Sequence, residues 1–257
     1  SYTSEGQQTR SKVISFHSPS FPGIQTARFS SMKLNKSIRL LLLGAPGSGK
    51  GTQTSRLLKA FLGIKSLSSG DTLRAEIARG SNLGDEASRY IHKGLLVPDS
   101  TMVSLIKEQL SVNNWLNERS SWLLDGFPRT RQQAERLDEV LGKNNANLNL
   151  VVELDVNQDV ILQRVEARWV HLSSGRVYNL DYNPPKVPFK DDVTGEDLLK
   201  RSDDTAEVFQ KRLDLYNQEI DPLRDYYESQ GILSRVSGDT SDLIFPQLAH
   251  LIEAKFA

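Results

Sequence analysis

The 257-residue chain contains no cysteine, which excludes disulfide bonds and thiolate metal sites and fits a reducing compartment. No apolar run reaches the length of about 18 residues that a membrane-spanning helix needs, so we expect no membrane insertion. Neither sign of charge prevails, with 32 basic and 32 acidic side chains, and we therefore expect no nucleic-acid partner. The hydrophobic content of 38% and the charged content of 25% are ordinary for a soluble globular protein, and the length suffices for one large domain or for one domain with insertions.

Residues 1–37 are nearly free of acid, since Glu5 is the single carboxylate beside five basic side chains. Serine is frequent in this segment, and prolines interrupt any long helix. A basic, serine-rich and acid-poor composition is typical of an organelle transit peptide. We therefore expect a segment that directs the protein to the mitochondrial matrix and is removed near residues 28–30. A plain disordered tail is the alternative interpretation.

Met32 leaves a second possibility for the start of the protein. Initiation at Met32 would produce a chain without most of the extension, and that chain would be cytoplasmic. In both cases we expect the functional domain over residues 38–257.

A glycine-rich loop follows the first apolar run, and the segment 38–52 reads IRLLLLGAPGSGKGT. Four consecutive leucines predict a strand that is buried on both faces, and residues 52–62 predict the helix that follows. Four glycines let the loop bring backbone N–H groups close to an anion: Gly44, Gly47, Gly49 and Gly51. The helix N-terminus and Lys50 add positive charge, which predicts a phosphate-binding loop. The loop departs from the pattern G-x-x-x-x-G-K-[ST], because Gly51 takes the hydroxyl position and Thr52 comes one residue later.

Apolar runs alternate with helical patterns along the rest of the chain. We expect further strands at residues 64–67, 121–124, 148–156 and 232–236. We expect helices at residues 72–79, 84–93, 99–112, 130–141, 157–168, 204–216 and 242–255, the sixth continuing to residue 230 after a break at Pro222. This order predicts an α/β fold with a doubly wound parallel sheet and a ligand cleft at the carboxyl ends of its strands.

Two further motifs stand where expected strands end. One reads SGDTLR from Ser69 to Arg74, and the other reads DGFPR from Asp125 to Arg129. Together with the glycine-rich loop, these motifs resemble those of the adenylate kinases, and the resemblance covers residues 38–257. It implies a P-loop kinase fold with an AMP-binding insertion at about residues 68–97 and a lid at about residues 168–204. It also implies transfer of a phosphoryl group from a nucleoside triphosphate to AMP, which yields ADP.

The resemblance implies a role for each motif residue. The loop residues hold the donor phosphates: Gly47, Ser48, Gly49, Lys50, Gly51 and Thr52. Arg74 and Arg129 hold the AMP phosphate, a task that suits guanidinium groups, and Gln133 reads the adenine edge. The remaining AMP contacts are Ser69, Leu95, Leu96, Val97, Gly126, Phe127 and Pro128. Asp125 orients Mg²⁺ through water, and the ion arrives with the nucleoside triphosphate.

Arginines flank the expected lid. Arg164 and Arg168 are four residues apart on one expected helix, and the resemblance implies that they face the donor phosphates. Arg201 and Arg212 face the transferred group and AMP, while Arg176, Val177 and Tyr178 lie against the donor base. The implied catalytic residues are Lys50, Arg129, Arg168, Arg201 and Arg212.

Some adenylate kinases hold the lid together with zinc bound to cysteines. The matching residues here are His171, Ser174, Asp191 and Thr194. Without thiolates we expect no zinc and a hydrogen-bonded polar cluster in its place.

The donor nucleotide is either GTP or ATP. The lid sequence is most similar to the mitochondrial branch of the family that uses GTP, and Thr240 stands near the donor base where many ATP-using members carry lysine. The alternatives are an ATP-dependent adenylate kinase and a nucleotide-binding scaffold without turnover. We expect a monomer.

Overall fold

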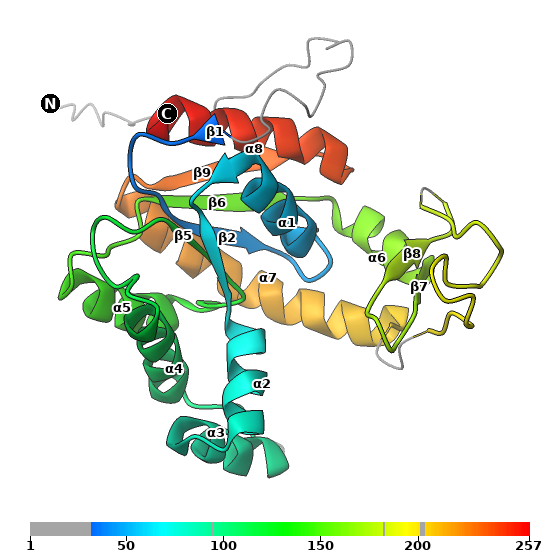
Figure 1. Ribbon diagram of the computed structural model, residues 1–257, viewed down its shortest axis with the longest axis horizontal. Helices are drawn as coiled ribbons and strands as arrows, with labels where there is room; N and C mark the ends of the chain where they lie inside the picture. The colour runs from blue at the N-terminus through cyan, green and yellow to red at the C-terminus, as the bar shows by residue number, and fades with distance from the viewer. Residues whose placement is uncertain (1–31, 94, 182, 201–203) are drawn as a thin grey trace, which may run out of the picture.

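The computed structural model describes residues 32–257 except Gly94, Tyr182 and residues 201–203. Its centre is a five-stranded sheet in the order β4-β5-β2-β6-β9, in which every neighbouring pair is parallel. The strands are β2 (Arg39–Gly44), β4 (Lys65–Ser68), β5 (Trp122–Asp125), β6 (Leu150–Asp155) and β9 (Leu233–Ser237). Helices lie on both sides of the sheet (Figure 1), so the expected doubly wound α/β fold is confirmed.

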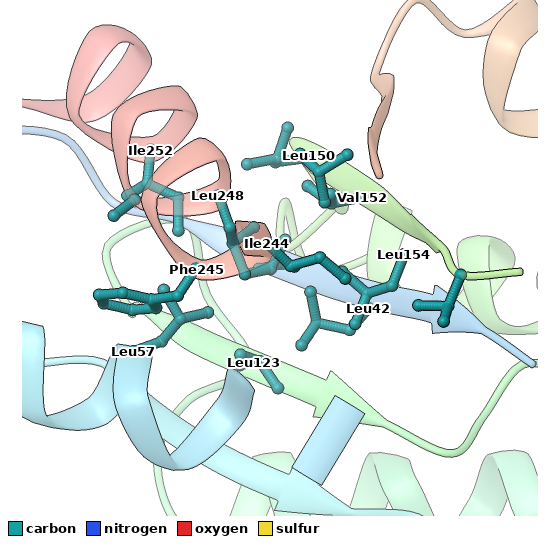
Figure 2. Close-up of a cluster of buried hydrophobic side chains, with 14 of the residues drawn as sticks. Leu42, Leu57, Leu123, Leu150, Val152, Leu154, Ile244, Phe245, Leu248 and Ile252 are labelled. Carbon is teal, nitrogen blue, oxygen red and sulfur yellow. The ribbon is translucent and has the colours of Figure 1, made fainter. Parts of the chain in front are cut away.

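The leucines of β2 show why this strand lies at the centre. Leu40 and Leu42 belong to one buried hydrophobic cluster, whereas Leu41 and Leu43 belong to another. Successive side chains of a strand point to opposite faces, so the leucine run supplies both halves of the core. Figure 2 shows Leu42 in the first of these clusters, with Leu248 from the C-terminal helix nearby.

The helices divide between the two clusters. Those on the first face are α1 (Lys50–Ala60), α6 (Gln158–Glu166) and α8 (Ser241–Phe256). Those on the second face are α4 (Asp99–Val112) and α5 (Arg131–Gly142). The long helix α7 (Ala206–Ser229) serves both clusters, because Phe209 and Leu213 pack in the first, and Ile220 and Leu223 pack in the second.

The helix α7 is continuous through Pro222, so the break expected there is wrong. A proline inside a helix deprives the carbonyl four residues earlier of its donor, here the carbonyl of Gln218. Gln218 and Pro222 are both exposed, so water can reach the affected turn. Ile220 and Leu223 are buried beneath the sheet and hold the helix on either side of the proline.

Two insertions project from the central layer (Figure 1). The first consists of α2 (Ser69–Arg79) and α3 (Asn82–His92), which approach so closely that a Cβ on Gly84 would lie 2.1 Å from the Glu76 carbonyl oxygen. The second begins with an antiparallel pair, β7 (Arg168–Val170) and β8 (Val177–Asn179), beside the first turns of α7.

The expected helix over residues 157–168 is too long at its end. The helix α6 stops at Glu166, and Arg168 opens β7, where it pairs with Asn179. The backbone N–H of Leu180 donates to the carbonyl of Ala167 at 3.2 Å, so strand pairing takes over directly after the helix. Arg164 and Arg168 therefore lie on different elements.

A buried carboxylate holds together the second insertion, which contains the expected lid. Asp191 accepts hydrogen bonds from Arg176 Nε and Nη2 at 2.8 and 2.7 Å, and from the Tyr178 hydroxyl at 2.8 Å. The Thr194 hydroxyl also donates to Asp191, at 2.9 Å. The guanidinium of Arg176 holds the pKa of Asp191 well below its usual range.

His171 joins the same cluster from the other side of the lid. Its Nδ1 is 2.6 Å from the Ser174 hydroxyl, its Nε2 is 3.4 Å from the Thr194 hydroxyl, and it also contacts the carboxylate of Glu196. The polar cluster expected from the sequence is therefore present, and Glu196 is an additional member that the sequence did not reveal.

The segment before residue 38 contacts the domain. Met32–Lys33 forms the short strand β1, which pairs with β3 (Phe61–Leu62). The backbone N–H groups of Asn35 and Lys36 donate to the Phe256 carbonyl at 2.9 and 3.1 Å. Composition assigns these residues to the extension, yet they pack against the domain. The rest of the expected targeting segment lies outside the described residues.

Two leucines on α7 allow a matched test of the first cluster. Leu213 is fully buried, whereas Leu215 is 63% exposed. We expect Leu213→Ala to lower the free energy of unfolding by about 2–5 kcal/mol, because it removes buried methyl groups and leaves a cavity. Leu215→Ala should change it by less than about 0.5 kcal/mol. Urea unfolding of both variants measures the difference, and equal losses would contradict the described packing of α7.

Candidate active site

The carboxyl ends of the parallel strands bring the sequence motifs to one edge. The glycine-rich loop follows β2, and Ser69 follows β4. Asp125 ends β5, where it pairs in register with Ser68. A Cβ on Gly126 would lie 2.7 Å from the Ser69 hydroxyl, so the SGDTLR and DGFPR motifs are in direct contact.

The glycine-rich loop needs glycine at two positions. Gly47 and Gly49 have φ angles of 79° and 90°, in the left-handed region that other residues rarely adopt. A Cβ on Gly47 would lie 2.9 Å from Ile161 and 3.0 Å from the ring of Phe209. The loop therefore lies directly on α6 and α7.

Lys50 is the first residue of α1 and bends back over the loop. Its Nζ donates to the carbonyl oxygens of Gly44 and Ala45 at 2.9 and 3.2 Å. Burial lowers the pKa of Lys50 to about 8; the positive charges of Arg129 and Arg212 act in the same direction and Asp125 opposes them. Two segments that are distant from Lys50 in sequence thus place charges within electrostatic range of it.

Asp125 is the carboxylate of this group. Burial raises its pKa, while the charges of Lys50 and Arg129 act in the opposite direction. A half-buried carboxylate beside two cations at the end of a strand can hold a cation or the water around one.

Gln133 is fixed by hydrogen bonds at both ends of its amide. Its Nε2 donates to Asp99 Oδ1 at 2.9 Å, and its Oε1 accepts from the backbone N–H of Arg129 at 2.7 Å. Arg129 also donates from Nε to the Gly126 carbonyl at 2.9 Å. The DGFPR turn and the start of α5 therefore form one hydrogen-bonded unit, and Asp99 is a member that sequence reasoning missed.

Arg74 lies at the outer side of this edge. It forms an ion pair with Asp71 one turn earlier on α2, and both side chains are more than 70% exposed. An exposed pair of this kind is weak, so the guanidinium is available to another anion.

Two arginines of the lid side meet at one aromatic ring. The Cζ atoms of Arg212 and Arg168 lie 4.9 and 5.9 Å from the ring centroid of Phe209. Arg168 Nε also donates to Asp204 Oδ2 at 2.9 Å, and the Asp204 side chain is completely buried. Sequence reasoning missed both Phe209 and Asp204. The spacing of three residues between Phe209 and Arg212 on one helix was the available signal.

Several expected lid contacts have other surroundings. The Tyr178 hydroxyl is bound within the lid cluster, where it donates to Asp191, while Val177 beside it is 45% exposed. Arg164 is half-buried in the last turn of α6. Arg201 lies outside the described residues.

The remaining expected contacts are residues 95–97 and Thr240. Leu95 and Leu96 are exposed, the latter by 93%, and Val97 is half-buried. The Thr240 hydroxyl accepts a hydrogen bond from the backbone N–H of Leu243 at 3.2 Å and caps α8. That hydroxyl therefore uses one of its lone pairs to cap the helix, and its O–H donor and the backbone of Thr240 remain for a base.

Comparisons with known proteins agree with these motifs. The family model described as adenylate kinase matches residues 42–232. A mitochondrial GTP:AMP phosphotransferase of Saccharomyces cerevisiae is 60% identical over 223 residues, which cover 87% of this chain and 95% of its own length. An adenylate kinase of Thermodesulfovibrio yellowstonii is 44% identical over 219 residues, which cover 85% of this chain and 100% of its own length. The chain belongs to the adenylate kinase family.

Proposed function

We propose that the protein transfers the γ-phosphoryl group of GTP reversibly to AMP and yields GDP and ADP. The observation that carries this proposal is that Lys50 of the glycine-rich loop lies within electrostatic range of Arg129, Arg212 and Asp125. Phosphoryl transfer requires mainly positioning and positive charge around spreading negative charge, and this group of side chains supplies both.

The glycine-rich loop is the proposed donor site. Backbone N–H groups of the loop and the N-terminus of α1 receive the phosphates. Lys50 exchanges two neutral carbonyl partners for charged phosphate oxygens, which form stronger hydrogen bonds. Arg164 and Arg168 approach the same phosphates from α6 and β7.

The AMP site is proposed on the opposite side of the edge. Arg74 exchanges its weak exposed pair with Asp71 for the AMP phosphate, and Arg129 binds the same phosphate. Gln133 enters this site with its amide already oriented by Asp99, so little rotamer entropy remains to be lost on binding. The leucines at positions 95 and 96 line the pocket for the base.

Mg²⁺ fits this site through Asp125. The ion prefers one or two carboxylates together with phosphate oxygens and water, and Asp125 is one carboxylate beside the proposed phosphate position. Bound there through water, it would neutralise charge on the donor phosphates.

The lid is proposed to close over the donor and exclude water that would otherwise accept the phosphoryl group. The cluster around Asp191 keeps the lid together without zinc, because Arg176, Tyr178 and Thr194 satisfy that buried carboxylate.

Two observations favour GTP as the donor. A relative from Saccharomyces cerevisiae that carries the name GTP:AMP phosphotransferase is 60% identical, whereas five relatives named adenylate kinase are 41–46% identical. In addition, Thr240 occupies the position where many ATP-using members carry lysine, and its hydroxyl is engaged in capping α8. An ATP-dependent adenylate kinase is the second candidate.

Initial rates with GTP, ATP and ITP, each with AMP, test the donor. We expect GTP to give the highest kcat/KM, and a clear preference for ATP would select the second candidate. A bisubstrate analogue that joins AMP to the donor separates both enzymes from a scaffold. A protein that binds this analogue but forms no ADP from any donor would refute the proposed activity.

Lys50 gives the reaction a defined pH dependence. Its pKa of about 8 means that the ammonium is charged below pH 8 and loses its proton as the pH rises through that value in the nucleotide-free protein. We expect kcat/KM for the donor to fall about tenfold per pH unit above pH 8, since kcat/KM reports the free enzyme. Bound phosphates favour the charged ammonium, so kcat should stay level to higher pH.

Two substitutions on α1 serve as controls for this profile. Lys50→Met should abolish transfer at every pH with the fold retained. Lys59→Met should leave both the rate and its pH profile unchanged, because Lys59 is exposed on the same helix. A kcat/KM that stays flat from about pH 7 to about pH 9.5 would refute the role of Lys50.

We further propose a monomeric protein of the mitochondrial matrix. The name of the Saccharomyces cerevisiae relative includes a mitochondrial location, and residues 1–37 have the composition of a transit peptide. No helix in the described part of the chain could span a membrane. A fluorescent reporter fused behind residues 1–37 should enter mitochondria, and one fused behind residues 32–37 alone should not. Diffuse cytosolic signal from the longer fusion would contradict this location.

A further inference from the structure

We propose that Phe209 is a positioning residue for phosphoryl transfer, because its ring holds the guanidinium groups of Arg168 and Arg212 and seats them against the glycine-rich loop. This inference rests on the proposed roles of the two arginines. It goes beyond them by naming what fixes their positions before a nucleotide binds.

The ring is itself immobile. Phe209 lies in the first turn of α7, where its backbone N–H donates to the Thr205 carbonyl at 3.0 Å, and it is only 1% exposed. It packs in the first hydrophobic cluster together with Ile161 and Leu213. A buried aromatic ring in a filled core has a fixed orientation, so groups that lie on it inherit that orientation.

The two arginines reach this ring from different elements. Arg212 is one turn further along α7, and its Cζ is 4.9 Å from the ring centroid. Arg168 comes from β7 at the base of the lid, with its Cζ at 5.9 Å. A guanidinium near an aromatic ring is attracted by the negative face of the ring, and the attraction grows when the pair is shielded from water. One ring therefore offsets part of the repulsion between two like charges.

The same ring also contacts the glycine-rich loop. A Cβ on Gly47 would lie 3.0 and 3.3 Å from the Cε1 and Cζ atoms of Phe209. Because Gly47 has no side chain, the ring of Phe209 packs directly against the loop backbone. Phe209 is therefore the shared contact between the proposed donor phosphate site and the two arginines, Arg168 and Arg212.

The two arginines depend on the ring to different degrees. Arg168 has a second support in the buried carboxylate of Asp204, which accepts from its Nε at 2.9 Å. We therefore expect loss of the ring to affect Arg212 more than Arg168.

Phe245 provides a matched control for a purely structural role. It belongs to the same hydrophobic cluster, is 4% exposed, and lies 6.0 Å from the Cζ of Arg56. Arg56 forms an ion pair with Asp242 and has no role in the proposed site. Replacing either phenylalanine by leucine removes an aromatic ring from the same hydrophobic core. In both cases the lost ring lies near at least one arginine.

The experiment compares Phe209→Leu with Phe245→Leu in AMP phosphorylation. We expect Phe209→Leu to lower kcat/KM about tenfold with GTP and with ATP alike, whereas Phe245→Leu stays within about twofold of the unchanged protein at a similar loss of thermal stability. Phe209→Met, which keeps a flexible apolar side chain, repeats the test if the leucine variant folds poorly. Equal rates for Phe209→Leu and Phe245→Leu would overturn the proposal, whichever donor the enzyme prefers.

A double-mutant cycle shows whether Phe209 acts through Arg212. Arg212→Lys keeps the charge but loses the planar group that stacks on a ring. We expect Phe209→Leu to have little further effect on kcat/KM in the Arg212→Lys protein. The full tenfold loss in that background would show that Phe209 acts through packing alone and would overturn the proposal.

Discussion

The constraint on which the active-site edge depends is the gathering of like charges beside a buried sheet. Burial lowers the pKa of Lys50, and the positive charges of Arg129 and Arg212 lower it further. The carbonyl oxygens of Gly44 and Ala45 accept hydrogen bonds from Lys50, and they offset only part of the free-energy cost of burying its charge. Because these partners are neutral, a polyanion gains more at this edge than it would at a site whose cations were already neutralised.

The central sheet provides the rigidity that such a site requires. Its strands are covered on both faces, and the leucines of β2 fill both hydrophobic clusters, so the strand ends that carry the loop and Asp125 are fixed relative to one another. The insertions are built differently. The lid satisfies its own buried carboxylate, Asp191, from Arg176 and Tyr178 within the same segment. A segment with internal partners can move as a unit without exposing an unpaired charge.

Local sequence patterns predicted those structural features that depend on residues close together in the chain. The apolar run of β2 and the glycine-rich loop were recognisable from the residues themselves, whereas the polar lid cluster was expected from the resemblance to the adenylate kinases. Contacts between distant segments were not recognisable, which is why the pairing of Arg168 with Asp204 and of Gln133 with Asp99 emerged only from the structure. The uninterrupted α7 escaped prediction for the same reason, since tertiary packing of its buried face outweighs the local cost of Pro222.

The loop departs from the general pattern, because Gly51 stands in place of a hydroxyl residue. The structure shows whether the fold itself requires glycine there. A fold requires glycine where a side chain would clash with neighbouring atoms, or where the backbone is in the left-handed region. Gly47 meets both, with a φ angle of 79° and a ring at 3.0 Å from its missing Cβ. Gly51 meets neither, because a Cβ there would have no neighbour within 4 Å among the described residues and its φ is helical. The fold therefore gives no reason for glycine at position 51, and the open space beside Lys50 agrees with the proposed role of this loop in holding phosphate groups.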